Sequence, residues 1–409
     1  MRSTTKLMKN WQFTGPDGKT VAVDLPHTWN NIDGQDGGND YWRGTCTYKT
    51  QFAAPAFDVA AQQVWLQFEG VNASARVTLN GVEVASHNGG YSTFRADITT
   101  VLGENNELTV EVDNSKNDRV YPQKADFTFY GGIYRDVTLL VVNKNHLALD
   151  YLGGPGVQIT PTVNGSNADI NVKSWTEGDG EVEFTVYEAD GSEVVSGKGS
   201  DTTVTIEHPH LWDGVRDPYL YTCVVRLVLN GEVQDEVSQR FGVRSFSVDS
   251  KQGFFLNGRP YPLHGVSRHQ DRKGLGNAIT REMHDEDMQF IKELGANTIR
   301  LAHYQHDQYF YDLCDEAGMV VWAEIPYISE HMPNGRENTI SQMKELIVQN
   351  YNHACIVCWG VSNEITISTK DNRDMRDNHH VLNDLCHEMD KTRLTTLACY
   401  AMCGPFNPV

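Results

Sequence analysis

The sequence predicts a multidomain protein in which two β-sandwiches precede an incomplete (β/α)8 TIM barrel. Three observations predict this class. The 409 residues are too many for one hydrophobic core. The first 250 residues or so contain short runs of alternating apolar and polar residues without helical periodicity, and strand-like and helix-like segments alternate after them. We expect domains at 1–147, 148–250 and 251–409.

Residues 1–147 have the pattern of an all-β domain. Runs such as "VWLQFEGV", "ARVTLNGVEVASH" and "ELTVEVDN" alternate in polarity, and Asn-Gly and Gly-Gly pairs, which favour tight turns, separate them. Because helical periodicity is missing, a jelly-roll β-sandwich is favoured.

Residues 148–250 repeat the β pattern in a shorter unit. Strand-like runs such as "ADINVKSW", "EVEFTVYEADG" and "YTCVVRLVLNGEVQDE" are separated by turn residues roughly every 8–12 positions. A length of about 100 residues with this spacing is typical of an immunoglobulin-like β-sandwich.

Residues 251–409 change to a β-α alternation that predicts a parallel sheet with helical crossovers. The first helix is expected within "TREMHDEDMQFIKELGA", with Thr280 as its N-cap and Gly295 as its C-cap. The pattern contains five strands and four helices. Since a complete (β/α)8 barrel needs about 250 residues, we expect only the N-terminal part of one.

Composition and charge disfavour several classes of partner. The formal net charge of −20 repels phosphate backbones, so no nucleic-acid partner is expected, and a neutral ligand suits the surface better. No apolar run is long enough for a membrane span, and the N-terminus lacks the apolar core of a signal peptide. The Cys355-x-x-Cys358 spacing lacks a second pair, so packed thiols are favoured over a metal site. These features predict a cytoplasmic protein.

Polar residues occur where four successive barrel strands are expected to end. Parallel barrel strands bring their carboxyl ends to one rim, which is where barrel enzymes place their active sites. The residues concerned are Arg268, His269, Arg300, His303, Glu324, Asn363 and Glu364. Taken singly, a strand-end His is more often structural, and Asn363-Glu364 could cap the next element. Their convergence favours a site.

Two long motifs carry a family resemblance. "NTIRLAHYQHDQYFYDLCDEAGMVVW" and "NYNHACIVCWGVSNE" resemble the signatures of glycoside hydrolase family 2, the group of β-galactosidases, β-glucuronidases and β-mannosidases. The resemblance extends over the whole chain, including "LWDGVRDPYLYT". Leu301 stands where a small residue is usual, and Gln305 stands where the pattern has Pro.

The resemblance implies a retaining glycosidase that cleaves terminal β-galactosides by double displacement. Glu364 would be the general acid/base, and Asn363 would hydrogen-bond the sugar 2-hydroxyl. Arg300 would pair with the nucleophile carboxylate, and His303 and His269 would donate to sugar hydroxyls. The role of Glu324 stays open between site residue and partner of an Arg.

A loop of the first domain helps to predict which sugar is bound. "YPQKADFTFYGGIYRDV" resembles the loop that β-galactosidases extend into their active site, and Asp126 matches their sugar-contacting Asp. Asp126 could instead be a simple turn residue. A second contact could come from "GGNDYWRG". The resemblance allows magnesium or sodium, although Ile328 stands where the family's magnesium-binding Glu is expected.

A second catalytic carboxylate was not found. In the family the nucleophile Glu lies on a later barrel strand, and Glu388 falls within the expected helix "LNDLCHEMDKTR". We therefore expect these 409 residues to be part of a longer enzyme and to be inactive alone. The alternatives are a β-glucuronidase of the same family, a non-catalytic carbohydrate-binding fragment, and an interaction module with an acidic surface. The resemblance also allows a homo-oligomer.

Overall fold

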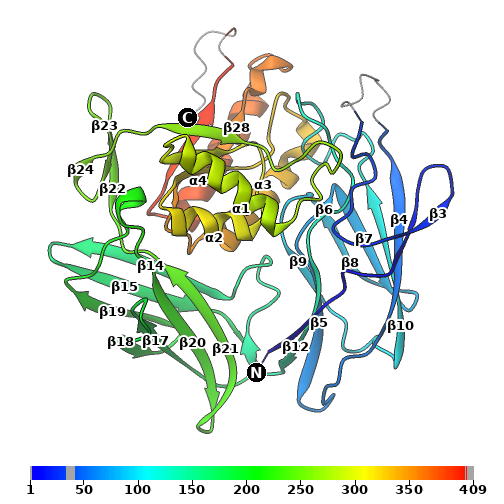
Figure 1. Cartoon of the computed structure of the whole chain (residues 1–409), viewed down its shortest axis with the longest axis horizontal. Helices are drawn as coiled ribbons and strands as arrows, with labels where there is room; N and C mark the ends of the chain where they lie inside the picture. The colour runs from blue at the N-terminus through cyan, green and yellow to red at the C-terminus, as the bar shows by residue number, and fades with distance from the viewer. Residues whose placement is uncertain (1, 34–41, 401, 403–409) are drawn as a thin grey trace.

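The computed structural model describes residues 2–33, 42–400 and 402. It confirms the predicted class, with two β-sandwiches beside an α/β unit (Figure 1). Each has its own cluster of buried apolar side chains, represented by Trp11, Phe184 and Trp359. The domain bounds given above stay predictions. None of the described helices is long and apolar enough to cross a membrane.

The N-terminal sandwich packs a four-stranded sheet on a six-stranded one. The first contains β1 (Ser3–Lys6), β12 (Val137–Asn143), β5 (Gln62–Phe68) and β9 (Phe94–Asp97) in that order. The second contains β3 (Thr20–Val23), β2 (Trp11–Thr14), β4 (Thr45–Ala53), β10 (Asn105–Asp113), β7 (Ser74–Leu79) and β8 (Val82–Asn88). A short pair joins β6 (Val71–Asn72) to β11 (Gly132–Ile133). Side chains alternate across a strand, so β10 buries Leu108, Val110 and Val112 between the sheets.

The second sandwich also consists of two sheets with alternating buried and exposed side chains. One sheet contains β14 (Val157–Asn164), β15 (Asn167–Ser174) and β19 (Asp201–Glu207), and the other contains β18 (Glu193–Lys198), β17 (Glu181–Tyr187), β20 (Tyr221–Leu229) and β21 (Glu232–Phe241). The pair β13 (His146–Leu147) and β16 (Thr176–Glu177) lies at its start, and the 3-10 turn η1 (Gly214–Arg216) precedes β20. On β15, Ile170 and Val172 point into the core while Asn171 and Lys173 point outward.

The C-terminal unit is a parallel sheet with helical crossovers. A small sheet of β22 (Phe246–Asp249), β23 (Gly253–Leu256) and β24 (Arg259–Pro260) precedes it. The parallel strands are β25 (Gly265–Arg268), β26 (Thr298–Leu301), β27 (Val320–Glu324), β28 (Ile356–Asn363) and β29 (Leu394–Ala398), in sequence order. The helices are α1 (Arg281–Glu293), α2 (Gln308–Ala317), α3 (Arg336–Asn350) and α4 (Arg373–Met389), with short 3-10 turns η2 (Pro333–Gly335) and η3 (Ile365–Ile367).

One of the two predicted caps of α1 is confirmed and the other is corrected. Thr280 is the N-cap of α1, as predicted, but its C-cap is Leu294, and Gly295 lies one residue further at φ +73°. Gly adopts this left-handed conformation without steric cost, so it turns the chain into the loop before β26.

Helix α3 fixes the first sandwich against the parallel sheet. Gln349 accepts from the Thr93 amide at 2.9 Å and donates to the Thr93 carbonyl at 2.9 Å. One turn earlier, Glu345 accepts from His87 Nε2 at 2.9 Å and from the Ser92 hydroxyl. These buried contacts hold the N-terminal domain where its 115–130 loop reaches the rim of the sheet.

The loop before β28 contains an ion pair whose stability contribution depends on pH. His353 Nδ1 lies 2.6 Å from the Asp315 carboxylate. Burial acts to lower the pKa of His353, but the Asp315 carboxylate outweighs it and raises that pKa above its usual value. A group whose pKa is raised in the folded state contributes its full stabilisation at pH values below its unfolded-state pKa, about 6.5 for His. This contribution is lost as the pH rises through the folded-state pKa.

We therefore expect His353→Gln to cost more stability at pH 6 than at pH 9. The measurement is urea unfolding of both proteins at the two pH values, with the exposed His264→Gln as the matched control. An equal cost at both pH values would show that the pair is not charged in the folded protein.

Candidate active site at the strand ends

Glu324 ends β27 and is a partner of Arg300, which is one of the two roles left open for this residue. The carboxylate is 1% exposed and accepts from Arg300 Nε at 3.1 Å and Nη2 at 3.0 Å. His303 Nδ1 lies 2.6 Å from the same carboxylate. The Arg300 guanidinium also stacks on the Trp322 ring at 4.2 Å. These contacts fix the ends of β26 and β27 against each other.

Asn363 ends β28 and joins this cluster. Its Oδ1 accepts from Arg300 Nη2 at 2.7 Å, and its side chain is buried. Arg300 engages the amide oxygen, and the two amide N–H groups are the donors that Asn363 can offer a ligand. This orientation suits the predicted contact with a sugar hydroxyl.

Glu364 follows Asn363 in a left-handed backbone conformation, at φ 48° and ψ 35°. This region is sparsely populated by residues with a Cβ and costs about 1–3 kcal/mol. The Glu364 N–H donates to the Ala398 carbonyl at 2.8 Å, which ties the turn to β29. The backbone thus turns at Glu364, whose side chain is only half buried.

The capping alternative for Asn363-Glu364 is met in position but not by a side-chain hydrogen bond. Glu364 occupies the N-cap position of η3, but its side chain makes no capping hydrogen bond. The Asn363 side chain is engaged by Arg300 instead. Helix capping therefore does not explain why a buried strand ends on these two polar residues.

His269 and His303 lie together, as predicted. Their rings are 5.2 Å apart, and the Phe127 ring lies 4.9 Å from His269 and 6.0 Å from His303. The pKa of His269 is lowered mainly by burial and secondly by His303, against the opposing charges of Asp271, Asp126 and Glu324. At neutral pH the His269 imidazole is therefore uncharged and acts as a hydrogen-bonding group.

The 115–130 loop brings Asp126 to this rim. Asp126 is exposed, and its charge acts on His269, while Phe127 packs on the two imidazoles. Arg43 supports this loop by donating to the Gln123 side chain at 2.8 Å and lying 4.8 Å over the Phe129 ring. In "GGNDYWRG", residues 37–41 lie outside the described residues, and Arg43 has this supporting position.

Arg268, the other residue at the end of β25, is not part of the cluster. Its guanidinium donates to Asp287 at 2.6 Å and lies 3.7 Å over the Phe310 ring, so it joins the helical layer. Conversely, sequence reasoning did not single out Phe127 and Tyr304, whose hydroxyl lies 3.3 Å from His269 Nδ1. The aromatic residues beside Asp126 and His303 were the available signal.

The positions that depart from the family pattern have structural uses. Leu301 is fully buried in the core. The Gln305 side chain donates to Gln349 at 2.8 Å, and the Gln305 backbone carbonyl accepts from Arg135 at 2.9 Å, which links the N-terminal domain to the barrel unit. Neither side chain takes a place in the cluster at the rim.

One group of side chains has the residue types of a metal site. The ligand atoms of Asp315, His353 and Cys355 lie within 4.8 Å of one another. Asp315 already accepts from His353 and from the Cys355 amide at 2.8 Å, and burial raises the pKa of the Cys355 thiol. A protonated thiol and an internally paired carboxylate favour a structural role. Ile328, at the expected magnesium position, is buried and apolar.

Three family models match successive parts of the chain. Residues 35–146 match the glycosyl hydrolase 2 galactose-binding domain-like model, residues 155–244 match glycosyl hydrolases family 2, and residues 247–404 match its TIM barrel domain. All three describe glycosyl hydrolases, which defines the class. The chain belongs to glycosyl hydrolases family 2.

The curated relatives that this chain resembles are named for two different activities. A β-glucuronidase of Bacteroides fragilis is 37% identical over 97% of this chain, and a β-galactosidase of Thermoanaerobacter pseudethanolicus is 28% identical over 94%. The chain spans 61% and 52% of their respective lengths.

The similar solved structures are named for the same two activities. An FMN-binding β-glucuronidase from Facaelibacterium prausnitzii L2-6 superposes with a TM-score of 0.97 and 43% identity, covering 100% of this chain and 65% of that one. A putative β-galactosidase from Bacteroides fragilis superposes with a TM-score of 0.92 and 38% identity, covering 97% and 63%.

Proposed function

We propose that this chain provides the acid/base side of the active site of a retaining β-glycosidase, with Glu364 as the acid/base. The observation that carries this proposal is the turn at the end of β28, where Glu364 follows Asn363 at the rim that also holds Arg300, His303 and His269. Membership of glycosyl hydrolases family 2 supports it. The carbohydrate-binding alternative requires no such carboxyl group.

The proposed reaction is a double displacement. A nucleophile carboxylate attacks the anomeric carbon, the bond to the glycosidic oxygen breaks, and Glu364 gives its proton to that oxygen. Glu364, now a carboxylate, takes a proton from water as the water oxygen attacks the anomeric carbon and displaces the enzyme carboxylate. Because the similar relatives are longer than this chain, we propose that the nucleophile belongs to a segment outside these 409 residues.

Asn363 and the two imidazoles would position the sugar. Arg300 holds the Asn363 oxygen, and the amide N–H groups are the donors that Asn363 would offer to the 2-hydroxyl. Hydrogen bonds to this hydroxyl strengthen in the oxocarbenium-like transition state. The uncharged His269 and the Glu324-bound His303 are suited to hydroxyl groups of the sugar.

The sugar is proposed to be a β-glucuronide, since two of the curated relatives with more than 30% identity bear the name β-glucuronidase. The β-galactoside predicted from the sequence is the second candidate, favoured by the β-galactosidase names among the relatives and by the place of Asp126 beside His269. An acidic residue at the sugar favours a neutral substrate, because a glucuronate carboxylate would be repelled.

Initial rates on aryl β-glucuronide and aryl β-galactoside test both points. For the longer polypeptide we expect a preference for the glucuronide of at least about tenfold in kcat/KM. The 409-residue chain alone is expected to be inactive on both. Asp126→Asn should change the ratio of the two rates, while the exposed Asp179→Asn should not. A galactoside preference that Asp126→Asn abolishes would reverse the assignment of the sugar.

A second candidate function is FMN binding. It is favoured by the 43% identical structure of an FMN-binding β-glucuronidase, which matches all of this chain. Quenching of FMN fluorescence on titration with the purified protein tests it. A protein that leaves the fluorescence unchanged at high micromolar concentration would exclude this function. The predicted cytoplasmic location stays a prediction.

A further inference from the structure

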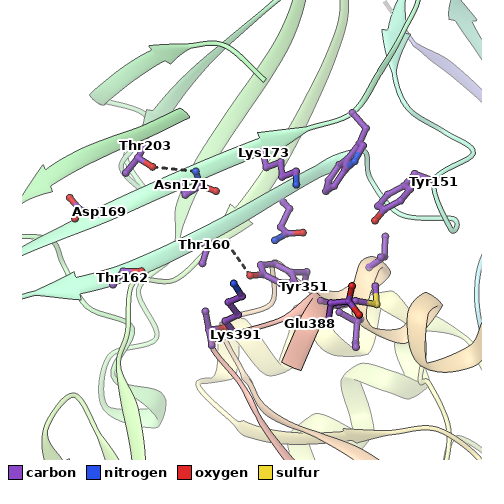
Figure 2. A pocket seen from close by; sticks show the side chains of 16 residues that line it. Tyr151, Thr160, Thr162, Asp169, Asn171, Lys173, Thr203, Tyr351, Glu388 and Lys391 are labelled. Atoms are coloured by element: carbon purple, nitrogen blue, oxygen red, sulfur yellow. Dashed lines mark hydrogen bonds between the residues drawn. The ribbon is translucent and has the colours of Figure 1, made fainter. Parts of the chain in front are cut away.

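A cleft separates the outer face of the second sandwich from the barrel unit, away from the strand-end cluster. The cavity measures about 590 Å³, and its lining includes none of the residues of that cluster (Figure 2). One wall is the outer face of β14 and β15, and the other is formed by the ends of α3 and α4 and the segments that follow them. Such a volume accommodates a small cofactor-sized molecule.

The two walls are fastened to each other, so the cleft is preformed. The Asn352 side chain accepts from the Ile159 amide at 2.8 Å and donates to the Val157 carbonyl at 3.0 Å. The hydroxyls of Thr160 and Tyr351 lie 3.0 Å apart across the floor, as the dashed line in Figure 2 shows. A ligand that fits this shape pays little to order it.

One end of the cleft is aromatic. Tyr151 stacks on Trp175 with ring centroids 4.5 Å apart and an interplanar angle of 22°. The Lys173 ammonium lies 5.4 Å over the Trp175 ring. Val348 and Met389 add apolar surface to the lining. Stacked aromatic rings beside apolar side chains are suited to a flat, conjugated ring system.

The opposite end is polar. In Figure 2, Thr162, Asn171 and Thr203 lie at the end away from Tyr151. These outward side chains come from alternate positions of the strands, where a sandwich normally meets water. They offer hydroxyl and amide groups to a polar part of a ligand.

Lys391 supplies a cation on the barrel wall. Its neighbour Asp390 is buried and pairs with Arg393 at 2.8 Å, and within residues 42–400 no carboxylate pairs with the Lys391 ammonium. The aromatic end holds both signs of charge, because Lys173 lies over the Trp175 ring and Glu388 lies nearer Tyr151 than Lys391 does (Figure 2). In the polar lining, the Asp169 carboxylate accepts from the Asn164 amide and the Thr205 hydroxyl. Lys391 is the lining cation farther from Tyr151 and can attract a phosphate. In a chain with a net charge of −20, this local arrangement decides how an anionic ligand is oriented.

We propose that this cleft binds FMN, with the isoalloxazine ring at the Tyr151–Trp175 end and the phosphate toward Lys391. The Gln158 amide and the Glu388 carboxylate lie in the lining as partners for the carbonyl and N–H groups of the ring. The inference rests on the proposed FMN binding and adds its location and orientation. It places the flavin outside the glycosidase site.

Titration of fluorescence with FMN and with riboflavin, which lacks the phosphate, tests the location. We expect Trp175→Ala to weaken binding of both ligands at least tenfold. Lys391→Glu should weaken FMN binding at least tenfold and leave riboflavin binding within twofold. Lys251→Glu, an exposed charge reversal outside the cleft, is the matched control and should bind both ligands as the wild type does.

The outcomes separate the two proposals. A wild-type protein that binds neither flavin overturns FMN binding itself. A wild-type protein that binds FMN while Trp175→Ala and Lys391→Glu bind it unchanged overturns the location and leaves FMN binding intact. Because Lys391 is exposed, its substitution does not threaten the fold, whereas circular dichroism checks that Trp175→Ala is folded.

Discussion

Replacing Glu364 by Gln in the longer, active polypeptide is expected to reduce kcat on glycosides with poor leaving groups by about 10²–10⁴-fold. The physical reason is that Gln cannot protonate the departing oxygen or activate water. With activated aryl leaving groups, which need no protonation, formation of the glycosyl-enzyme should be nearly normal, and its hydrolysis should become the slow step. The measurement is kcat and kcat/KM over a series of aryl glycosides of decreasing leaving-group acidity.

Two further readouts make this test specific to acid/base catalysis. Added azide, which attacks the anomeric carbon without a general base, should restore turnover of the activated substrate in Glu364→Gln. Glu293→Gln, an exposed carboxylate at the end of α1, should retain wild-type rates. If the loss in Glu364→Gln is the same for every leaving group and azide has no effect, Glu364 is a positioning residue.

Replacing Glu324 by Gln is expected to destabilise the folded protein by about 3 kcal/mol, the lower end for breaking a buried ion pair. The substitution keeps the shape of the side chain and removes the charge that neutralises Arg300, whose side chain is 23% exposed. It also weakens the contact with His303 at 2.6 Å. Urea unfolding followed by tryptophan fluorescence measures the cost.

The matched control is Glu111→Gln, which breaks the pair with Arg76 on the surface of the first sandwich. Both of its side chains are more than a third exposed, so the expected cost is below about 1 kcal/mol. An equally small cost for Glu324→Gln would mean that water or another group compensates Arg300. In that case the cluster would not be held together by this carboxylate.

The order and type of the elements can be predicted from the sequence. Alternation in strands such as β10 and β15, and caps such as Thr280, arise from neighbouring residues along the chain, so they can be read locally. The Asn363-Glu364 pair was found for the same reason, because a polar pair ends a buried strand. The family motifs then supplied its chemistry.

Which side chains meet depends on the packing of the three units and is seen in the structure. It placed Glu324 against Arg300 and His303, turned Arg268 into the helical layer, and showed that the Glu364 side chain makes no capping hydrogen bond. It also brought Trp175 and Lys391, more than 200 positions apart, to one cleft. Local periodicity depends on the hydrogen bonding of each segment, whereas these contacts depend on strand register and on how the three units pack, which neighbouring residues do not encode.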